Sequence, residues 1–114
     1  MCKLGLIAAL LLTLSCTRDQ PKDLEISALI TAFESSGLSL ERNGEQLHNA
    51  EASQWLRRKL TARSSDVRSP EDFIRRVADH SSETKKPYLI ILSDGTKELS
   101  AEWFNAKLKE MRSR

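Results

Sequence analysis

Cysteine is almost absent from this sequence. Cys2 and Cys16 are the only two among 114 residues, and both lie near the N-terminus. The chain after residue 16 therefore has no thiol, which excludes a disulfide framework and a cysteine metal site there. A domain built from it must be held together by packing alone.

Glycine, histidine and excess charge are also scarce. The four glycines stand singly, so no glycine-rich loop could cradle a phosphate. His48 and His80 have no carboxylate cluster at metal-ligand spacing nearby, so we expect no metal site and no cofactor. Without Lys3, 17 basic side chains (18 minus 1) face 16 acidic ones. A net charge of +1 gives no indication of nucleic-acid binding.

A long apolar run is missing too. The stretch Leu4–Leu14 is apolar except for Gly5 and Thr13. As a helix it would rise about 16 Å, roughly half the hydrocarbon thickness of a bilayer. With Lys3 ahead of it, this stretch predicts a signal peptide over residues 1–15 rather than a membrane span.

The segment Thr13-Leu14-Ser15-Cys16 resembles a bacterial lipobox, in which the cysteine is acylated and the chain is cut before it. We therefore expect lipidation of Cys16, with acyl chains such as palmitate in the membrane and a lipidated tether over residues 16–23. The alternative is ordinary cleavage that leaves a free cysteine. Thr17, where sorting signals can carry an acid, favours a periplasm-facing anchor in the outer membrane.

The most apolar stretch of the remaining chain is Pro87–Leu92, which ends at the turn dipeptide Asp94-Gly95. Its composition predicts a central strand buried on both faces. A hairpin is expected around Asn43-Gly44, the preferred dipeptide of a type I′ turn, with strands at 38–42 and 45–48. Residues 97–99 can return as a short edge strand.

Apolar stripes at helical spacing predict four helices, at 24–36, 49–64, 70–80 and from Ser100 onward. Their expected N-caps are Asp23, Asn49, Ser69 and Ser100, and Gly37 is expected just past the end of the first helix. The sequence thus predicts one α+β domain over residues 24–112. Its element order is α-β-β-α-α-β-α, with helices packed on a short sheet.

Several short segments occur in the order typical of a small exported bacterial family. They are Glu34-Ser35-Ser36-Gly37, Arg42-Asn43-Gly44, Ala52, Leu56–Leu60, Asp72-Phe73-Ile74 and Ser81–Tyr88, followed by Asp94-Gly95 and Trp103. Over residues 24–108 the chain resembles the YfeK-like domains of unknown function. Lys85 stands where glycine is common in that family. The resemblance implies an envelope location and no established activity.

The polar hairpin and the loop after the third helix are the predicted binding surface: Arg42, Asn43, Gly44, Ser81, Ser82, Thr84, Lys86 and Tyr88. Both segments adjoin the sheet, where an edge strand could accept a strand from a partner. The alternative is that they only connect elements. The run Arg57-Arg58-Lys59, with Arg63, is interpreted as a solvated helix face rather than a contact with anionic lipid or peptidoglycan.

No catalytic residue is assigned. Asp79, His80, Ser81 and Ser82 are the residue types of a nucleophilic triad, but sequence neighbours at a helix end rarely align as one. Glu34 and Glu45 could be imagined as paired carboxylates, without any special spacing to support them.

The sequence therefore predicts an envelope lipoprotein whose domain binds an envelope protein or a cell-wall partner without catalysis. The alternative is an enzyme, or a subunit of one, acting on an envelope substrate through Glu34, Arg42 or His80. A pocket that gathers two of these three would favour the enzyme. A structural link between membrane and wall is a third possibility.

Overall fold

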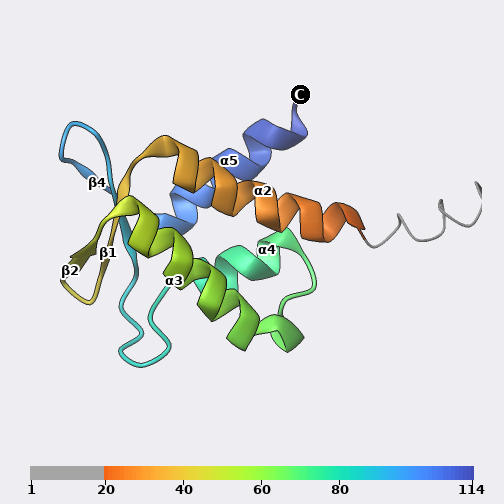
Figure 1. The fold of residues 1–114 in the computed structure, drawn as a ribbon, viewed down its shortest axis with the longest axis horizontal. Helices are drawn as coiled ribbons and strands as arrows, with labels where there is room; N and C mark the ends of the chain where they lie inside the picture. Colours follow the sequence, from red (N-terminus) through yellow and green to blue (C-terminus); the bar gives the residue numbers. More distant parts are fainter. Residues whose placement is uncertain (1–19) are drawn as a thin grey trace, which may run out of the picture.

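A computed structural model of the chain describes residues 20–114. Its elements are α2 (Gln20–Ser36), β1 (Ser39–Arg42), β2 (Glu45–Leu47), α3 (Asn49–Ala62), η1 (Ser64–Asp66), α4 (Pro70–Phe73), η2 (Ile74–Ala78), β3 (Leu89–Ile91), β4 (Lys97–Leu99) and α5 (Ser100–Arg112). The strands form one antiparallel sheet in the order β2-β1-β3-β4, and the helices lie to one side of it (Figure 1). This arrangement confirms the predicted α+β class.

The predicted signal peptide over residues 1–15 and the lipidated Cys16 lie outside the described residues. Between Gln20 and Arg114, the structure contains no helix with both the length and the apolar character needed to cross a membrane.

The sheet consists of two hairpins joined by their inner strands. Asn43 and Gly44 have φ angles of 52° and 82°, the left-handed values that a type I′ turn requires, so the predicted β1–β2 hairpin is confirmed. β4 is also present as the predicted edge strand. The hairpins meet where Leu40 of β1 lies opposite Ile90 of β3.

The prediction that the central strand is buried on both faces is wrong. Ile90 is fully buried, whereas its neighbours Leu89 and Ile91 are only partly so. Successive side chains of a strand point to opposite faces, and the helices lie to one side of the sheet (Figure 1). The burial of Ile90 therefore places it on the covered face. With one face open, a half-buried strand such as β1 can also occupy the centre of the sheet.

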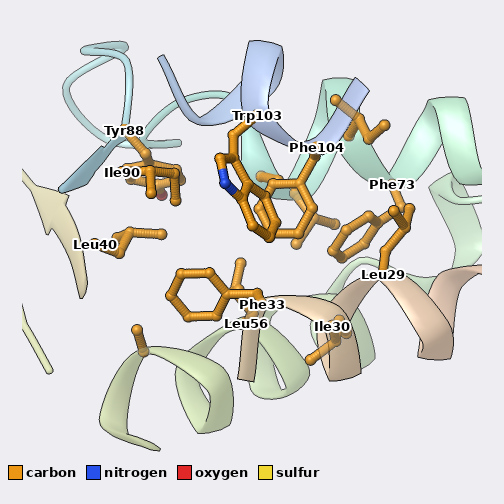
Figure 2. Packing of buried hydrophobic residues seen from close by; sticks show 14 of the residues in the cluster. Leu29, Ile30, Phe33, Leu40, Leu56, Phe73, Tyr88, Ile90, Trp103 and Phe104 are labelled. Atoms are coloured by element: carbon orange, nitrogen blue, oxygen red, sulfur yellow. The ribbon is translucent and has the colours of Figure 1, made fainter. Parts of the chain in front are cut away.

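The core lies between the covered sheet face and the helices (Figure 2). Phe33 of α2 meets the Trp103 ring edge-on at a centroid distance of 5.9 Å, and Phe73 meets Phe104 in the same way at 5.7 Å. Edge-to-face packing suits the aromatic quadrupole, so these pairs add to the burial of apolar area. They join α2, α4 and α5 into the layer that supports the sheet.

Two helices differ from their predicted bounds. α2 begins at Gln20, so residues 20–23 of the predicted tether are helical and Asp23 lies in the first turn instead of capping it. Gly37, with a φ of 72°, follows α2 as predicted. The predicted helix over 70–80 is a short α4 that continues as the π-helical η2. Its Ser69 cap is confirmed, because the Ser69 hydroxyl accepts a hydrogen bond from the Asp72 amide at 3.0 Å.

Asn49 and Ser100 were predicted as N-caps and are not. The Asn49 amide instead donates to the carbonyls of Phe33 (2.9 Å) and Leu38 (2.8 Å), satisfying acceptors where α2 passes into β1. For Asn49, tertiary partners replace the local one. Ser100 is the first residue of α5 rather than its cap: its backbone amide donates to the Tyr88 carbonyl at 2.9 Å, and its buried hydroxyl has no hydrogen-bond partner among the described residues.

Candidate functional site

A hollow of about 390 Å³ lies between the β1–β2 hairpin, α3 and the loop of residues 81–86. We call it the hairpin–loop pocket. It is lined by Arg42, Asn43, Trp55, Lys59, Ala62, Arg63, Ser81, Ser82, Glu83 and Tyr88. The fold thus brings Arg42 and Asn43 of the predicted binding surface together with Ser81, Ser82 and Tyr88.

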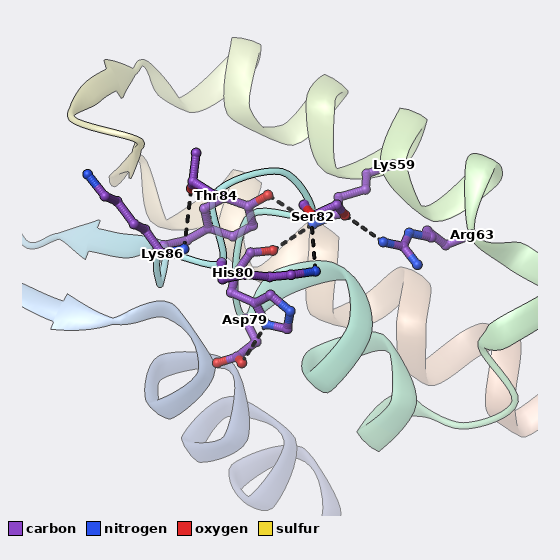
Figure 3. A network of polar contacts seen from close by, with 9 residues as sticks. Lys59, Arg63, Asp79, His80, Ser82, Thr84 and Lys86 are labelled. Carbon is purple, nitrogen blue, oxygen red and sulfur yellow. Dashed lines mark hydrogen bonds and ion pairs between the residues drawn. The ribbon is translucent and has the colours of Figure 1, made fainter.

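Lys59 extends from α3 toward the loop (Figure 3). Its ammonium donates to the His80 carbonyl and to the Tyr88 hydroxyl, both at 2.9 Å. Burial, reinforced by the positive charge of Arg63, lowers the pKa of Lys59 to about 8. No ion pair joins this ammonium to any carboxylate of residues 20–114. The prediction that Lys59 belongs to a solvated face is therefore wrong.

Two arginines complete the positive wall of the pocket. The Arg42 guanidinium lies 5.2 Å from the centroid of the Trp55 ring, and Arg63 donates to the Ser82 hydroxyl at 2.5 Å. Their ion pairs to Glu45 (3.6 Å) and Asp66 (3.8 Å) are long and exposed, so they neutralise little charge. With Lys59, the lining carries three cations against the single carboxylate of Glu83.

The loop is fixed to the tip of the hairpin. Thr84 donates from its hydroxyl to the Asn43 side-chain oxygen at 2.6 Å, and the Ser81 hydroxyl accepts from the Glu83 and Thr84 amides. Lys85 has a φ of 65°, a left-handed conformation that glycine adopts without strain. This conformation explains why glycine suits that position.

Three predicted binding residues do not line the pocket. Gly44 forms the turn, Thr84 braces the loop, and Lys86 contributes backbone hydrogen bonds to Ser81 and Thr84. Sequence reasoning missed the pocket residues Trp55, Lys59, Ala62, Arg63 and Glu83. The signal was the spacing of Trp55, Lys59 and Arg63 at four-residue intervals, which places them on one helix face.

The catalytic candidates are not assembled. The His80 ring lies 2.9 Å from the Asp79 carboxylate, but the Ser81 and Ser82 hydroxyls are occupied by loop amides and by Arg63. Of the suspected trio Glu34, Arg42 and His80, Arg42 alone lines the pocket, and Glu34 pairs with Arg57 at 3.3 Å. Within residues 20–114, no group of three His, Cys, Asp or Glu side chains could hold a metal ion.

A larger hollow of about 610 Å³ lies between α2, α3 and η1, with Ile26, Ile30 and Leu60 in its walls. Its one arginine, Arg57, already pairs with Glu34. The hairpin–loop pocket is the better candidate despite its smaller volume, because several donors of hydrogen bonds converge there and specificity depends on such groups.

Comparison with known protein families matches residues 20–112 to a model described as "Family of unknown function (DUF5329)". No curated protein and no solved structure matches the chain.

Proposed function

We propose, from the premise that this chain belongs to the DUF5329 family of unknown function, that its domain is a binding module of the bacterial envelope. The hairpin–loop pocket is its binding site, and an envelope protein or a cell-wall component is its partner. The YfeK-like resemblance and the lipobox-like segment before Cys16 support the location. In this proposal the chain is a lipoprotein anchored through Cys16 and facing the periplasm.

The observation that carries the proposal is the convergence at the pocket. Three segments that are distant in sequence contribute Arg42, Lys59 and Ser82 to one hollow, and the Thr84–Asn43 hydrogen bond holds two of these segments together. A cavity whose polar groups are already positioned binds with a smaller loss of conformational entropy. This pre-organisation supports recognition of a partner.

The short distance to the anchor bears on where the partner lies. The chain takes four residue steps from Cys16 to the start of α2 at Gln20, and four steps span at most about 14 Å. A lipidated chain would therefore keep its domain close to the bilayer surface. A partner in the membrane, or in the part of the wall nearest to it, fits this restriction.

The second candidate function is enzymatic action on an envelope substrate, and one observation favours it. Lysines whose pKa is lowered by burial serve as bases and nucleophiles, and Lys59 has a pKa of about 8. Enzymatic action is disfavoured because Glu34, Arg42 and His80 do not meet in one pocket. The binding module is therefore the function we propose.

In-cell crosslinking tests the proposal. A photoreactive residue replaces Glu83, which is exposed at the pocket, and in a matched control it replaces Glu102, which is exposed on α5. Adducts are identified by mass spectrometry. We expect one dominant adduct from position 83 that position 102 does not give. Equal adducts from the two positions, or none from position 83, would contradict a binding site at the pocket.

A further inference from the structure

The geometry points to an oxyanion, the chemistry shared by carboxylate and phosphate groups, as the ligand group that enters the hairpin–loop pocket between Lys59, Arg42 and Arg63. This inference rests on the pocket being the binding site and adds the chemical class of what it binds.

The first argument is the supply of hydrogen-bond donors. An ammonium has three N–H donors, and Lys59 uses two of them on the His80 carbonyl and the Tyr88 hydroxyl. The Tyr88 hydroxyl accepts from Lys59, and the Ser82 hydroxyl accepts from Arg63. Each hydroxyl therefore keeps its own proton for another acceptor. An ionised carboxylate or phosphate only accepts hydrogen bonds, so it complements this set.

The second argument is charge. Three cations line the pocket with one carboxylate, that of Glu83, which lies in the exposed part of the loop. Taking an ammonium partly out of water without an ionic partner is costly, and a bound anion would offset that cost. Trp55 also lines the pocket, and the centroid of its ring lies 5.5 Å from the Lys59 ammonium.

The protonation of Lys59 links binding to pH. The charged or titratable groups that face it are Arg63 just after α3, Arg42 from β1, Asp79 just after η2, and Tyr88 before β3. A bound anion favours the protonated lysine, so it raises the lysine's pKa above about 8. We therefore expect affinity to fall about tenfold between pH 7 and pH 9.5.

Titration of the full isotope-labelled chain in detergent micelles, followed by NMR, tests the inference. Acetate and inorganic phosphate are the two probes, and sodium chloride at equal ionic strength is the control. We expect saturable shifts of the Trp55 indole N–H and of amides in residues 81–88 with at least one probe. Saturation by acetate alone identifies a carboxylate site, and saturation by phosphate alone a phosphate site. Shifts that match those of chloride would overturn the inference.

Variants identify the residues involved. Arg42→Gln and Lys59→Met should each weaken the probe's affinity about fivefold or more, because each removes a charge-assisted hydrogen bond. Arg58→Gln is the matched control, since Arg58 is exposed on the same helix and does not line the pocket. Arg42 is partly exposed, so its variant keeps the test valid if Lys59→Met does not fold. Equal affinities in Arg42→Gln and Arg58→Gln would also overturn the inference.

The two proposals fail in different ways. A crosslinked partner at position 83 without saturable anion binding would overturn the oxyanion and leave the binding module intact. Saturable anion binding with no crosslinked partner would support the oxyanion site and contradict the macromolecular partner.

Discussion

The ammonium of Lys59 donates to the hydroxyl of Tyr88 at 2.9 Å and joins the last turn of α3 to the residue just before β3. Burial disfavours the charged form of both groups. It lowers the pKa of Lys59 to about 8 and raises the pKa of Tyr88 to about 12. Folding therefore holds a lysine in a place where its charge is disfavoured, which is a recognised feature of functional sites.

This pair predicts an unusual pH dependence of stability. As the pH rises from about 8 to 10, Lys59 loses its proton in the folded chain but largely keeps it in the unfolded chain. The unfolded state then binds more protons, so the free energy of unfolding rises with pH. Because Lys59 is only half-buried, we expect a rise of about 1 kcal/mol, measured by urea unfolding at several pH values.

Lys59→Met removes the titrating group and should abolish this rise. Arg58→Met, on the exposed part of the same helix, should keep it. A pH profile that is the same in Lys59→Met as in the parent chain would show that another group causes the dependence. Tyr88 does not confuse the comparison, because its raised pKa lowers stability only above about pH 10.

The sheet predicts a contrast between adjacent isoleucines. Ile90 is fully buried between β1 and the helices, so Ile90→Ala should cost about 3 kcal/mol of unfolding free energy. Ile91 is only partly buried on the open face, so Ile91→Ala should cost about 1 kcal/mol. Thermal or urea unfolding measures both. Equal losses would contradict the one-sided sheet.

Turn and helix-cap preferences predicted much of the fold, because these preferences depend on residues close in sequence. Asn43-Gly44 demands a tight turn, and Ser69 before Pro70 demands a helix start, whatever surrounds them. Asn49 was misassigned because carbonyls distant in sequence accept from its side chain. Ser100 was misassigned because α5 begins one residue earlier than predicted, with Leu99 as its N-cap.

The candidate site was only half predictable for the same reason. Arg42 and Ser82 were identified because hairpins and polar loops are common binding segments. Lys59 was not, because nothing local distinguishes a basic residue on a wet face from one that a distant loop covers. Its burial exists only once the segment from His80 to Tyr88 has folded against α3.

Lys85 offers a stabilising substitution. A residue with a side chain costs about 1 kcal/mol at a left-handed position, and Lys85 has a φ of 65°. Lys85→Gly should therefore raise the unfolding free energy by about 0.5 kcal/mol, after the greater flexibility of glycine in the unfolded chain is counted. Lys86→Gly is the control. Lys86 lacks a positive φ, so glycine there should destabilise.

The proposed anchor makes a prediction about processing. Cys16→Ala removes the thiol that would carry the lipid, so the variant should remain an uncleaved, unlipidated precursor. Its migration on gels and its distribution between membrane and soluble fractions should both change, whereas Cys2→Ala should behave like the parent chain. If Cys16→Ala fractionates and migrates like the parent, lipidation at this cysteine is wrong.

The junction between β1 and β3 has a consequence for the order in which the chain folds. Each hairpin closes a short loop and can form early. Leu40 and Ile90 lie 50 positions apart in the sequence, with α3 and α4 in the intervening chain, so their pairing closes a much longer loop. We expect this pairing to form after the rate-limiting step. Leu40→Ala would then mainly speed unfolding and leave the refolding rate nearly unchanged. The pairing of β1 with β3 would therefore determine the lifetime of the native state.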